Sequence, residues 1–368
     1  MGWSWRTGRI AGIDVYVHLT FVLLLAWMGL AHYLAGGAAA AIRGLGLILT
    51  LFGIVVLHEL GHSLAARRFG IETRDITLLP IGGVARLERM PEEPRQELVV
   101  ALAGPAVNVA LAAGVYLLPF GRDVLSVGET FGGLGSFMSQ IFWVNVGLAV
   151  FNLLPAFPMD GGRVLRALLA MRIDYVRATQ IAAGIGQGMA WLFGLLGLLF
   201  NPFLVFVALF VWIGAAQEAS MVQMRSALDG IPVRNAMITE FHALDPNDTL
   251  SRAVEHILAG FQQDFPVVED GRPVGVLTRN DLAAGLAQRG PEARVGEFMH
   301  RGCATTDPRE MLQVAFARLQ DQDCHVLPVV QDGRLLGLLT GDNVAEVLMI
   351  KEALRAARRA ASEAARAG

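Results

Sequence analysis

The stretch VLHELGH (Val56–His62) lies at the end of an apolar segment that runs from Gly44 to Ala66. On a helix, His58 and His62 share one face, so their ring nitrogens can reach one metal ion. This H-E-x-x-H spacing is typical of a zinc site in which the glutamate, here Glu59, acts as a base. The alternative is a helix end at the lipid headgroups with three solvated polar side chains. A catalytic zinc needs a third protein ligand and an open position.

A second polar stretch supplies a candidate for that third ligand. NLLPAFPMDGG (Asn152–Gly162) follows an apolar segment, and Asp160 is its single acidic residue. Proline interrupts a membrane helix and frees backbone groups to face a polar cavity. Clusters of Pro, Asp and Gly are also common in plain turns. Because both stretches end apolar segments on the same predicted side of a membrane, Asp160 is the expected third ligand.

The composition divides the chain into two parts. Hydrophobic residues make up 54% of the 368 residues and charged residues only 17%, against about 25% charged in soluble proteins. The deficit lies before Gln217, and the remaining sequence reads as a soluble domain. The net charge of −3 gives no support for nucleic-acid binding. The two cysteines, Cys303 and Cys324, are expected to be reduced cytosolic thiols.

The first part predicts a polytopic α-helical membrane domain with six transmembrane helices, since a bilayer core of about 30 Å needs roughly 20 apolar residues per helix. Arginines are concentrated before the first segment and in alternate loops, which predicts a cytosolic N-terminus and a cytosolic C-terminal domain in the cell membrane. The expected segments cover Val15–Tyr33, Gly44–Ala66, Leu98–Leu118, Phe137–Leu154, Ile181–Leu199 and Pro202–Gln217.

An internal repeat with an offset of 62 residues occupies the second part. FPVV (Phe265–Val268) corresponds to LPVV (Leu327–Val330), and the Asp-Gly-Arg turn at Asp270–Arg272 recurs at Asp332–Arg334. Each copy reads as helix, apolar strand, Asp-Gly hairpin turn, strand and helix. Two such copies are expected to bury their sheets against each other in an α/β module.

The membrane part resembles the site-2 protease family of intramembrane metalloproteases, through HELGH, NLLPAFPMDG, PIGG (Pro80–Gly83) and AGPAVN (Ala103–Asn108). The resemblance implies zinc held by His58, His62 and Asp160, with Glu59 as the base. It further implies that Asn152 and Asn108 orient the substrate or the oxyanion, and that Gly82 and Gly83 belong to a membrane-associated β-hairpin whose edge can pair with substrate. An interhelical hydrogen bond worth about 1 kcal/mol is an equal alternative for Asn108.

The repeat resembles a tandem pair of cystathionine β-synthase-type (CBS) domains, which often bind adenine nucleotides through a Thr/Ser-x-x-Asp pattern at the ribose. The first copy keeps this pattern as Thr278 and Asp281, whereas the second has Asn343 in place of the aspartate. Asp281 could equally serve only to cap the following helix. Dimerisation through the module is a comparable expectation.

These observations predict a transmembrane zinc metalloprotease domain over residues 1–225, CBS domains at 231–290 and 291–350, and a helical Ala/Arg-rich tail at 351–368. The expected activity is an intramembrane zinc endopeptidase that cleaves single-span membrane proteins within the lipid bilayer. Its expected cofactors are one Zn²⁺ per chain and an adenine nucleotide at the CBS pair. The alternatives are a membrane transporter or channel gated by the CBS pair, and an inactive protease-like scaffold.

Overall fold

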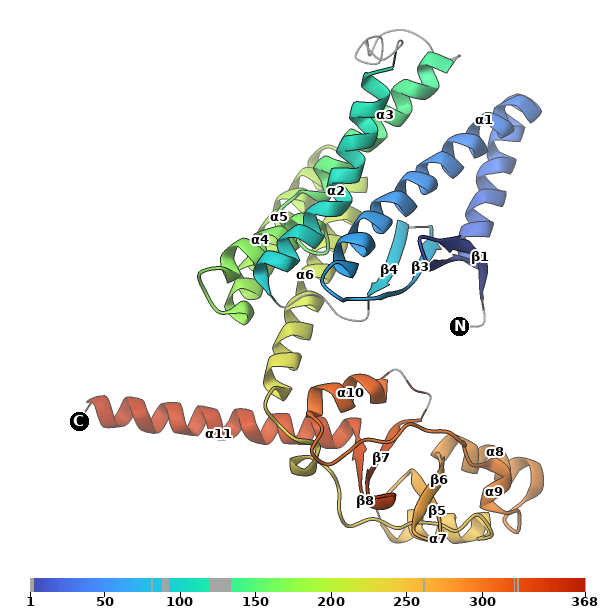
Figure 1. The fold of residues 1–368 in the computed structure, drawn as a ribbon, viewed down its shortest axis with the longest axis vertical. Coiled ribbons are helices and arrows are strands. Elements are labelled where there is room, and N and C mark those ends of the chain that lie inside the picture. Colours follow the sequence, from blue (N-terminus) through green and yellow to red (C-terminus); the bar gives the residue numbers. More distant parts are fainter. Residues whose placement is uncertain are drawn as a thin grey trace. The chain divides into compact units, whose positions relative to one another are not determined.

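The chain forms two compact units, Met1–Val222 and Gln223–Gly368 (Figure 1). This computed structural model describes residues 3–80, 82–87, 93–118, 134–260, 262–320, 322 and 324–367. The first unit is dominated by long helices with a small sheet at one end, and the second unit combines short strands with helices (Figure 1).

Six helices begin in the described part of the first unit. Among the described residues, four of them are long and apolar enough to cross a membrane, namely α1, α2, α5 and α6, and α3 contains a shorter apolar stretch over Phe137–Asn152. The short α4 follows α3 after the proline-rich loop. Their bounds are α1 (Leu19–Arg67), α2 (Pro94–Tyr116), α3 (Leu134–Asn152), α4 (Asp160–Ala170), α5 (Tyr175–Leu199) and α6 (Phe203–Leu228).

The 49 residues of α1 are interrupted at two glycines. Gly36 and Gly37 have non-helical backbone angles, and Gly37 has φ of 71°, a conformation that glycine adopts without steric cost. A continuous helix of this length would be about 74 Å long, more than twice the thickness of a bilayer core. The break divides α1 into two segments, and the second of them carries HELGH near its end.

Large apolar side chains cover the outside of these helices. Trp27, Leu34, Leu198 and Phe206 are each between 66% and 79% exposed. Contiguous apolar surface of this kind is rare on soluble proteins and suits a lipid environment. The first unit is therefore a helical domain of the membrane type.

The expected first transmembrane segment is wrong at its start, because Val15–His18 forms a strand. Strand β2 (Ile13–His18) pairs antiparallel with β1 (Ser4–Ile10) and parallel with β3 (Thr73–Leu79). Ile13 and Val15 are buried while Asp14 and Tyr16 are less so, and this alternation suits a strand with one covered face. The helix begins only at Leu19, after His18, whose side chain accepts a hydrogen bond from the Thr20 amide.

The PIGG motif lies at the turn between β3 and β4 (Gly82–Leu87), with Ile81 outside the described residues. The two strands are antiparallel, and the sheet order is β1-β2-β3-β4. Gly82 has φ of 139°, which favours glycine. Because β4 is the last strand in this order, it pairs on one side only, with β3, among the described strands.

The second unit contains two copies of one strand pair. β5 (Phe265–Glu269) pairs with β6 (Arg272–Leu277), and β7 (Val326–Gln331) pairs with β8 (Arg334–Thr340). Both pairs turn through an Asp-Gly with positive φ at both residues, as two-residue type I′ hairpins require. The remaining elements are η2 (Val233–Asn235), α7 (Leu250–Ala259), α8 (Arg279–Arg289), α9 (Val295–Phe298), α10 (Leu312–Gln320) and α11 (Gly341–Ala367).

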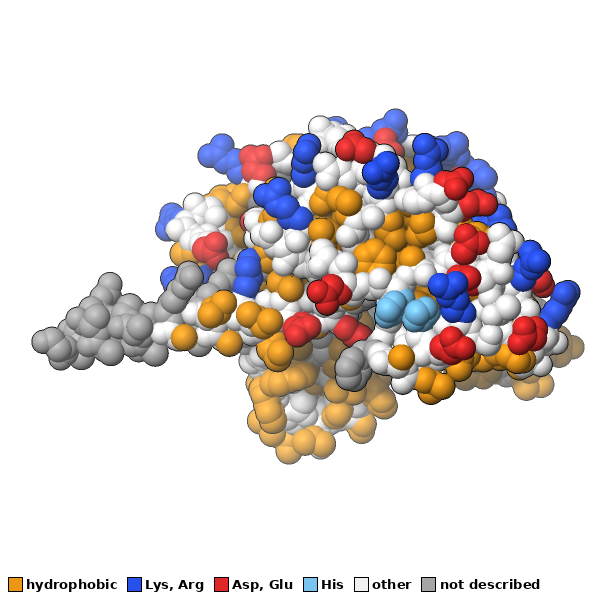
Figure 2. Space-filling model, turned by 90° about the horizontal axis from the view of Figure 1, so that it is seen from below, with side chains coloured by type: hydrophobic (Ala, Val, Ile, Leu, Met, Phe, Trp, Pro, Cys, Tyr) orange, Lys and Arg blue, Asp and Glu red, His pale blue; other side chains and the backbone are white. Residues whose placement is uncertain are grey.

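The internal repeat is visible in the details of these pairs. The register shift between Val267 and Val268 recurs between Val329 and Val330, at the offset of 62 residues. Each copy has its own buried core, one around Phe265 and one around Leu327. Side chains of both charges are interspersed on the face seen in Figure 2, as is usual for a domain in contact with water.

The expectation of two reduced thiols is wrong in this structure. Cys303 and Cys324 form a disulfide, with a Cα–Cα distance of 6.3 Å. The residues are 21 positions apart, and the fold of the second repeat brings them together, because Cys303 lies shortly before Thr306, which pairs with β7, and Cys324 lies just before β7 itself. Proximity of this kind depends on strand pairing and does not appear in cysteine counts.

Candidate metal centre

Three buried side chains from two helices converge at one point. His58 and His62 lie on the second segment of α1, and Asp160 is the first residue of α4. The Nε2 atoms of His58 and His62 are 3.2 Å and 3.0 Å from Asp160 Oδ2, and 3.1 Å from each other. One ligand atom from each residue thus lies in a group small enough to hold a metal ion.

The geometry and the donor set suit zinc. A tetrahedral ion with bonds of about 2.0–2.1 Å places its ligand atoms about 3.3 Å apart, close to the three distances observed. Two imidazoles and one carboxylate are a known ligand set for catalytic zinc, and they leave a fourth position for water or substrate. The residues present therefore fit the metal that the sequence predicts.

The second nitrogen of each histidine ring is held by α2. His62 Nδ1 donates to the Val100 carbonyl oxygen at 2.7 Å, and His58 Nδ1 to Asn108 Oδ1 at 2.5 Å. Partners of this kind fix the ring orientation and tautomer, which leaves both Nε2 lone pairs free for a metal. Asn108 is thus placed behind a histidine, where it orients the ring.

Asn145 on α3 completes this chain of hydrogen bonds. Asn108 Nδ2 donates to Asn145 Oδ1 at 3.1 Å, and Asn145 Nδ2 donates to the Ile141 carbonyl oxygen at 2.8 Å. Both asparagines are fully buried. Sequence reasoning missed Asn145, and its only signal was a polar residue amid an apolar helix, which commonly marks an interhelical contact.

One face of α2 lies against both histidine rings, and the three residues involved are spaced four positions apart, about one helical turn. Val100 and Asn108 hold the two rings, and between them Gly104 leaves space for the imidazoles. A Cβ at Gly104 would lie 2.2 Å from His62 Nε2 and 2.7 Å from His58 Nε2. Only glycine permits α2 to pass this close to the histidines, which explains the AGPAVN motif in physical terms.

The proline-rich loop delivers Asp160. It folds back over the first turn of α4, where a Cβ at Gly161 would lie 2.2 Å from the Leu154 carbonyl oxygen and one at Gly162 would lie 2.6 Å from the Phe157 nitrogen. The two glycines are therefore required for this close approach. Arg163, one turn along α4, places Nη1 3.7 Å from Asp160 Oδ1, on the side away from the histidines.

Glu59 lies beside the ligands and against the sheet. A Cβ at Gly83 would be 3.1 Å from Glu59 Cγ and 2.9 Å from Val55 Cγ1. The start of the edge strand β4 therefore contacts the helix face that carries Glu59. This arrangement brings a carboxylate, the candidate ligands and a strand edge that is unpaired among the described strands into one place.

The remaining predicted site residues are Asn152, Thr278 and Asp281. Asn152 is the last residue of α3, and the structure shows no hydrogen bond of its side chain within the described residues. Thr278 and Asp281 in the second unit bond to each other in a capping box at the start of α8. Asp281 Oδ1 also pairs with His300 Nε2 at 3.1 Å. These contacts show the capping role, and they leave nucleotide binding untested.

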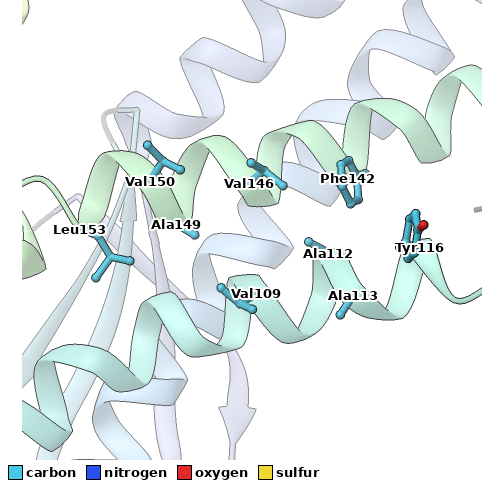
Figure 3. Close-up of a pocket in the computed structure, with 9 residues that line it drawn as sticks. All are labelled: Val109, Ala112, Ala113, Tyr116, Phe142, Val146, Ala149, Val150 and Leu153. Atoms are coloured by element: carbon cyan, nitrogen blue, oxygen red, sulfur yellow. The ribbon is translucent and has the colours of Figure 1, made fainter. Parts of the chain in front are cut away.

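A separate pocket of about 500 Å³ lies between α2 and α3 (Figure 3). Of its lining residues, only Tyr116 has a polar side-chain atom, so the lining offers no metal ligand and no general base. The candidate metal centre is therefore the histidine–aspartate cluster and not this pocket. The pocket is lined by Val109, Ala112, Ala113, Tyr116, Phe142, Val146, Ala149, Val150 and Leu153.

A H-E-x-x-H pair on an apolar helix, joined by a distant aspartate, defines a metalloprotease of the membrane type. Comparison with known proteins gives the family. Residues 46–123 and 124–193 match peptidase family M50, and residues 233–288 and 295–350 each match the CBS domain. A zinc metalloprotease of Methanocaldococcus jannaschii is 31% identical over 353 residues, covering 96% of this chain and 98% of that relative. The chain therefore belongs to peptidase family M50.

Two further relatives match parts of the chain. The solved site-2 protease from Methanocaldococcus jannaschii is 38% identical and covers 59% of this chain and 95% of that chain, with a TM-score of 0.44. The CBS domain-containing protein YhcV of Bacillus subtilis is 26% identical over 122 residues, 33% of this chain and 87% of that relative. The predicted relationships to site-2 proteases and CBS domains, and the enzyme class of zinc metalloprotease, are confirmed.

Proposed function

We propose that this chain is a zinc endopeptidase that cleaves transmembrane segments inside the bilayer. The observation that carries the proposal is the buried cluster of His58, His62 and Asp160 beside Glu59. The histidines and Glu59 lie on α1, one of the helices long and apolar enough to cross a membrane. Ionisable groups at such positions are expensive in lipid and mark functional sites.

His58, His62 and Asp160 would hold the zinc through two Nε2 atoms and Oδ2. When bound, zinc acidifies a water molecule and polarises a carbonyl group. Glu59 follows His58 directly and accepts the proton of the attacking water. It then returns that proton to the nitrogen of the leaving amine. Glu59 therefore accepts one proton during the attack of water and gives it up as the amine leaves, so it is a carboxylate again at the end.

The edge of β4 would present the substrate to this site. Carbonyls in a helix are engaged in hydrogen bonds to the amide four residues later, so the segment to be cut must first become extended. An extended segment can add as a strand to a free sheet edge. Gly83, the second residue of β4, lies next to Glu59, so a strand added along the edge that Gly82 and Gly83 begin would pass beside the catalytic base.

We propose six transmembrane spans, with α1 contributing two and α2, α3, α5 and α6 one each. The break at Gly36 and Gly37 supports the division of α1. The distribution of arginines favours a cytosolic N-terminus and a cytosolic CBS pair in the cell membrane. The substrates in this proposal are single-span membrane proteins, which expose one helix to the site.

The CBS pair is proposed to regulate the protease through an adenine nucleotide or through homodimerisation. Nucleotide binding at Asp281 would use its carboxylate, which in this structure bonds to Thr278 and to His300. Direct binding of ATP or AMP to the full chain, compared between the wild type and Asp281→Asn, tests the nucleotide proposal. Binding that does not depend on Asp281 would place the ligand elsewhere.

Cleavage is tested by co-expressing candidate single-span proteins with the wild type or with Glu59→Gln. The variant should lose cleavage while its zinc content equals that of the wild type, since Glu59 is not a ligand. Glu72→Gln is the matched control, because Glu72 is exposed just after α1. Full activity of Glu59→Gln would exclude the role of general base, and a wild type without zinc would exclude the metalloprotease mechanism.

A further inference from the structure

Arg166 is the largest fully buried side chain among the described residues, with 1% of its surface exposed. It lies six residues after Asp160 on α4, about 9 Å along the helix axis. Its Nε donates to Glu97 Oε1 at 2.7 Å, and Nη2 donates to the same oxygen. Its Nη1 donates to Glu218 Oε1 at 2.6 Å. One guanidinium group thus connects α4 to α2 and α6.

Two aromatic rings hold the same guanidinium. Arg166 Cζ is 5.0 Å from the ring centroid of Phe157 and 5.0 Å from that of Tyr175. Phe157 belongs to the loop that delivers Asp160, so Arg166 also contacts the segment on the other side of the metal ligand. Phe157 before Asp160 and Arg166 after it therefore belong to one buried cluster.

Stability alone is a poor explanation for this cluster. Burying charges has a desolvation cost that often exceeds the attraction between them, and packed apolar residues serve stability as well or better. Directional hydrogen bonds from an arginine, by contrast, specify how three helices are placed relative to one another. A buried guanidinium with two carboxylates is thus best suited to fixing a geometry.

The geometry that it fixes is that of the metal ligands. Glu97 lies on the same buried face of α2 as Val100 and Asn108, whose oxygens hold His62 and His58. A shift of α2 relative to α4 would move both rings away from Asp160. Among the described residues, Glu97 Oε2 has no hydrogen-bond partner, so the hold on Glu97 comes from Arg166 through Oε1.

We propose that Arg166 is a positioning residue of the metal centre, which sets the distance between Asp160 on α4 and the histidine rings that α2 holds. It does this through Glu97, Glu218 and Phe157, and it touches neither the metal nor the substrate. The proposal deepens the proposed function, on which it rests, and it concerns the affinity and shape of the metal site.

The test measures metal binding on the full chain purified in detergent. Zinc retention against a chromophoric chelator is compared for the wild type and Arg166→Lys, which keeps the charge but cannot bond Glu97 and Glu218 in the same planar arrangement. The expected loss of zinc affinity is roughly tenfold or more, as for other residues behind metal ligands. The visible absorption of the cobalt-loaded protein should also change, because it reports ligand geometry.

Two further variants separate positioning from folding. Glu218→Gln removes the charge of one partner only and should give a smaller loss of zinc affinity with the same direction of spectral change. Arg172→Lys makes the same substitution at an exposed arginine just after α4 and should match the wild type. Helical content and thermal unfolding are recorded for every variant, so that a misfolded protein is recognised. If Arg166→Lys does not fold, the zinc affinity of Glu218→Gln decides the test.

A folded Arg166→Lys with wild-type zinc retention and a wild-type cobalt spectrum would overturn the proposal. So would an equal loss in Arg172→Lys, since the effect would not belong to the buried cluster. The readout uses zinc and cobalt alone. A wild type that binds zinc but cleaves nothing would contradict the protease function and leave the role of Arg166 measurable.

Discussion

Asn108 donates to Asn145 at 3.1 Å between α2 and α3, and through its other side-chain atom it accepts the Nδ1 proton of His58. Both asparagines are fully buried. The amide of Asn108 is oriented by Asn145, because its nitrogen must donate there for its oxygen to face the histidine. A residue on α3 thus controls the tautomer of a candidate zinc ligand on α1.

Replacing Asn145 with leucine should weaken metal binding without touching a ligand. Asn108 would lose the partner that orients its amide, and a roughly tenfold to hundredfold loss of zinc affinity or activity is expected. Chelator competition on the purified chain measures this loss. Asn235→Leu is the control, since Asn235 is exposed in the second unit. Unchanged zinc affinity in Asn145→Leu would show that Asn108 needs no support from α3.

Replacing Gly104 with alanine should disrupt the metal centre sterically. The added Cβ would lie 2.2 Å from His62 Nε2, so the ring or the helix must move. A loss of zinc affinity of roughly tenfold or more is expected, together with a loss of cleavage. Gly114→Ala lies on the same helix where a Cβ meets nothing within 4 Å, and it should keep full metal content. Equal behaviour of the two variants would contradict the close approach of α2.

The second unit should lose part of its stability in mild acid. Burial raises the pKa of Glu310, but hydrogen bonds from Arg318 and Thr306 outweigh it and lower this pKa below its ordinary value of 4.5. A carboxyl with a lowered folded-state pKa stabilises the fold above its unfolded-state pKa, and this stabilisation disappears as the pH falls through the folded-state value. The contribution is therefore complete at neutral pH and is lost as the pH falls below the ordinary value and through the lowered folded-state pKa.

Hydrogen exchange of the full chain, corrected for intrinsic rates, checks this pH dependence. Protection of α10 and β7 should be greater in the wild type than in Glu310→Gln at pH 6, and the two should converge at low pH. Glu240→Gln, at an exposed position, should follow the wild type throughout. A difference that persists unchanged in acid would show that the carboxylate charge of Glu310 is not the cause.

The disulfide between Cys303 and Cys324 should stabilise the second unit when it is formed. A cross-link that closes a loop of this size contributes about 3 kcal/mol in the chain-entropy model. The oxidised wild type should therefore show slower exchange in β7 than a Cys303→Ala, Cys324→Ala double variant. Reductant should remove most of this difference, and a difference that survives reduction would have to arise from side-chain packing instead.

Local motifs in the sequence predicted the candidate ligands, whereas pairings between distant segments were not predicted. His58, His62 and Asp160 were selected because their residue types and neighbours are unusual within apolar segments, and the structure brings them together. The strand at Val15–His18 was missed because apolar residues there continue into a helix. Its parallel partner β3 lies about sixty residues later, and no local pattern reveals such a pairing.

Residues that act through others were the hardest to find. Asn145 and Arg166 touch no predicted ligand directly, so neither motif nor spacing indicates them. The same limit applies to Cys303 and Cys324, which became neighbours only through the pairing of the second repeat. In each case the information lies in how separate helices or strands pack, and a single sequence read along its length does not contain it in recognisable form.

One side of β4 has no partner among the described strands, and this has a consequence for selectivity. A sheet edge offers amides and carbonyls, and these groups are common to every residue of an incoming chain. A protease that captures its substrate in this way distinguishes helices by how readily they unwind in lipid, so glycine, proline or an asparagine near the cut should matter more than any consensus of side chains. Foreign helices that resist unwinding would pass the enzyme uncut, whatever residues they present.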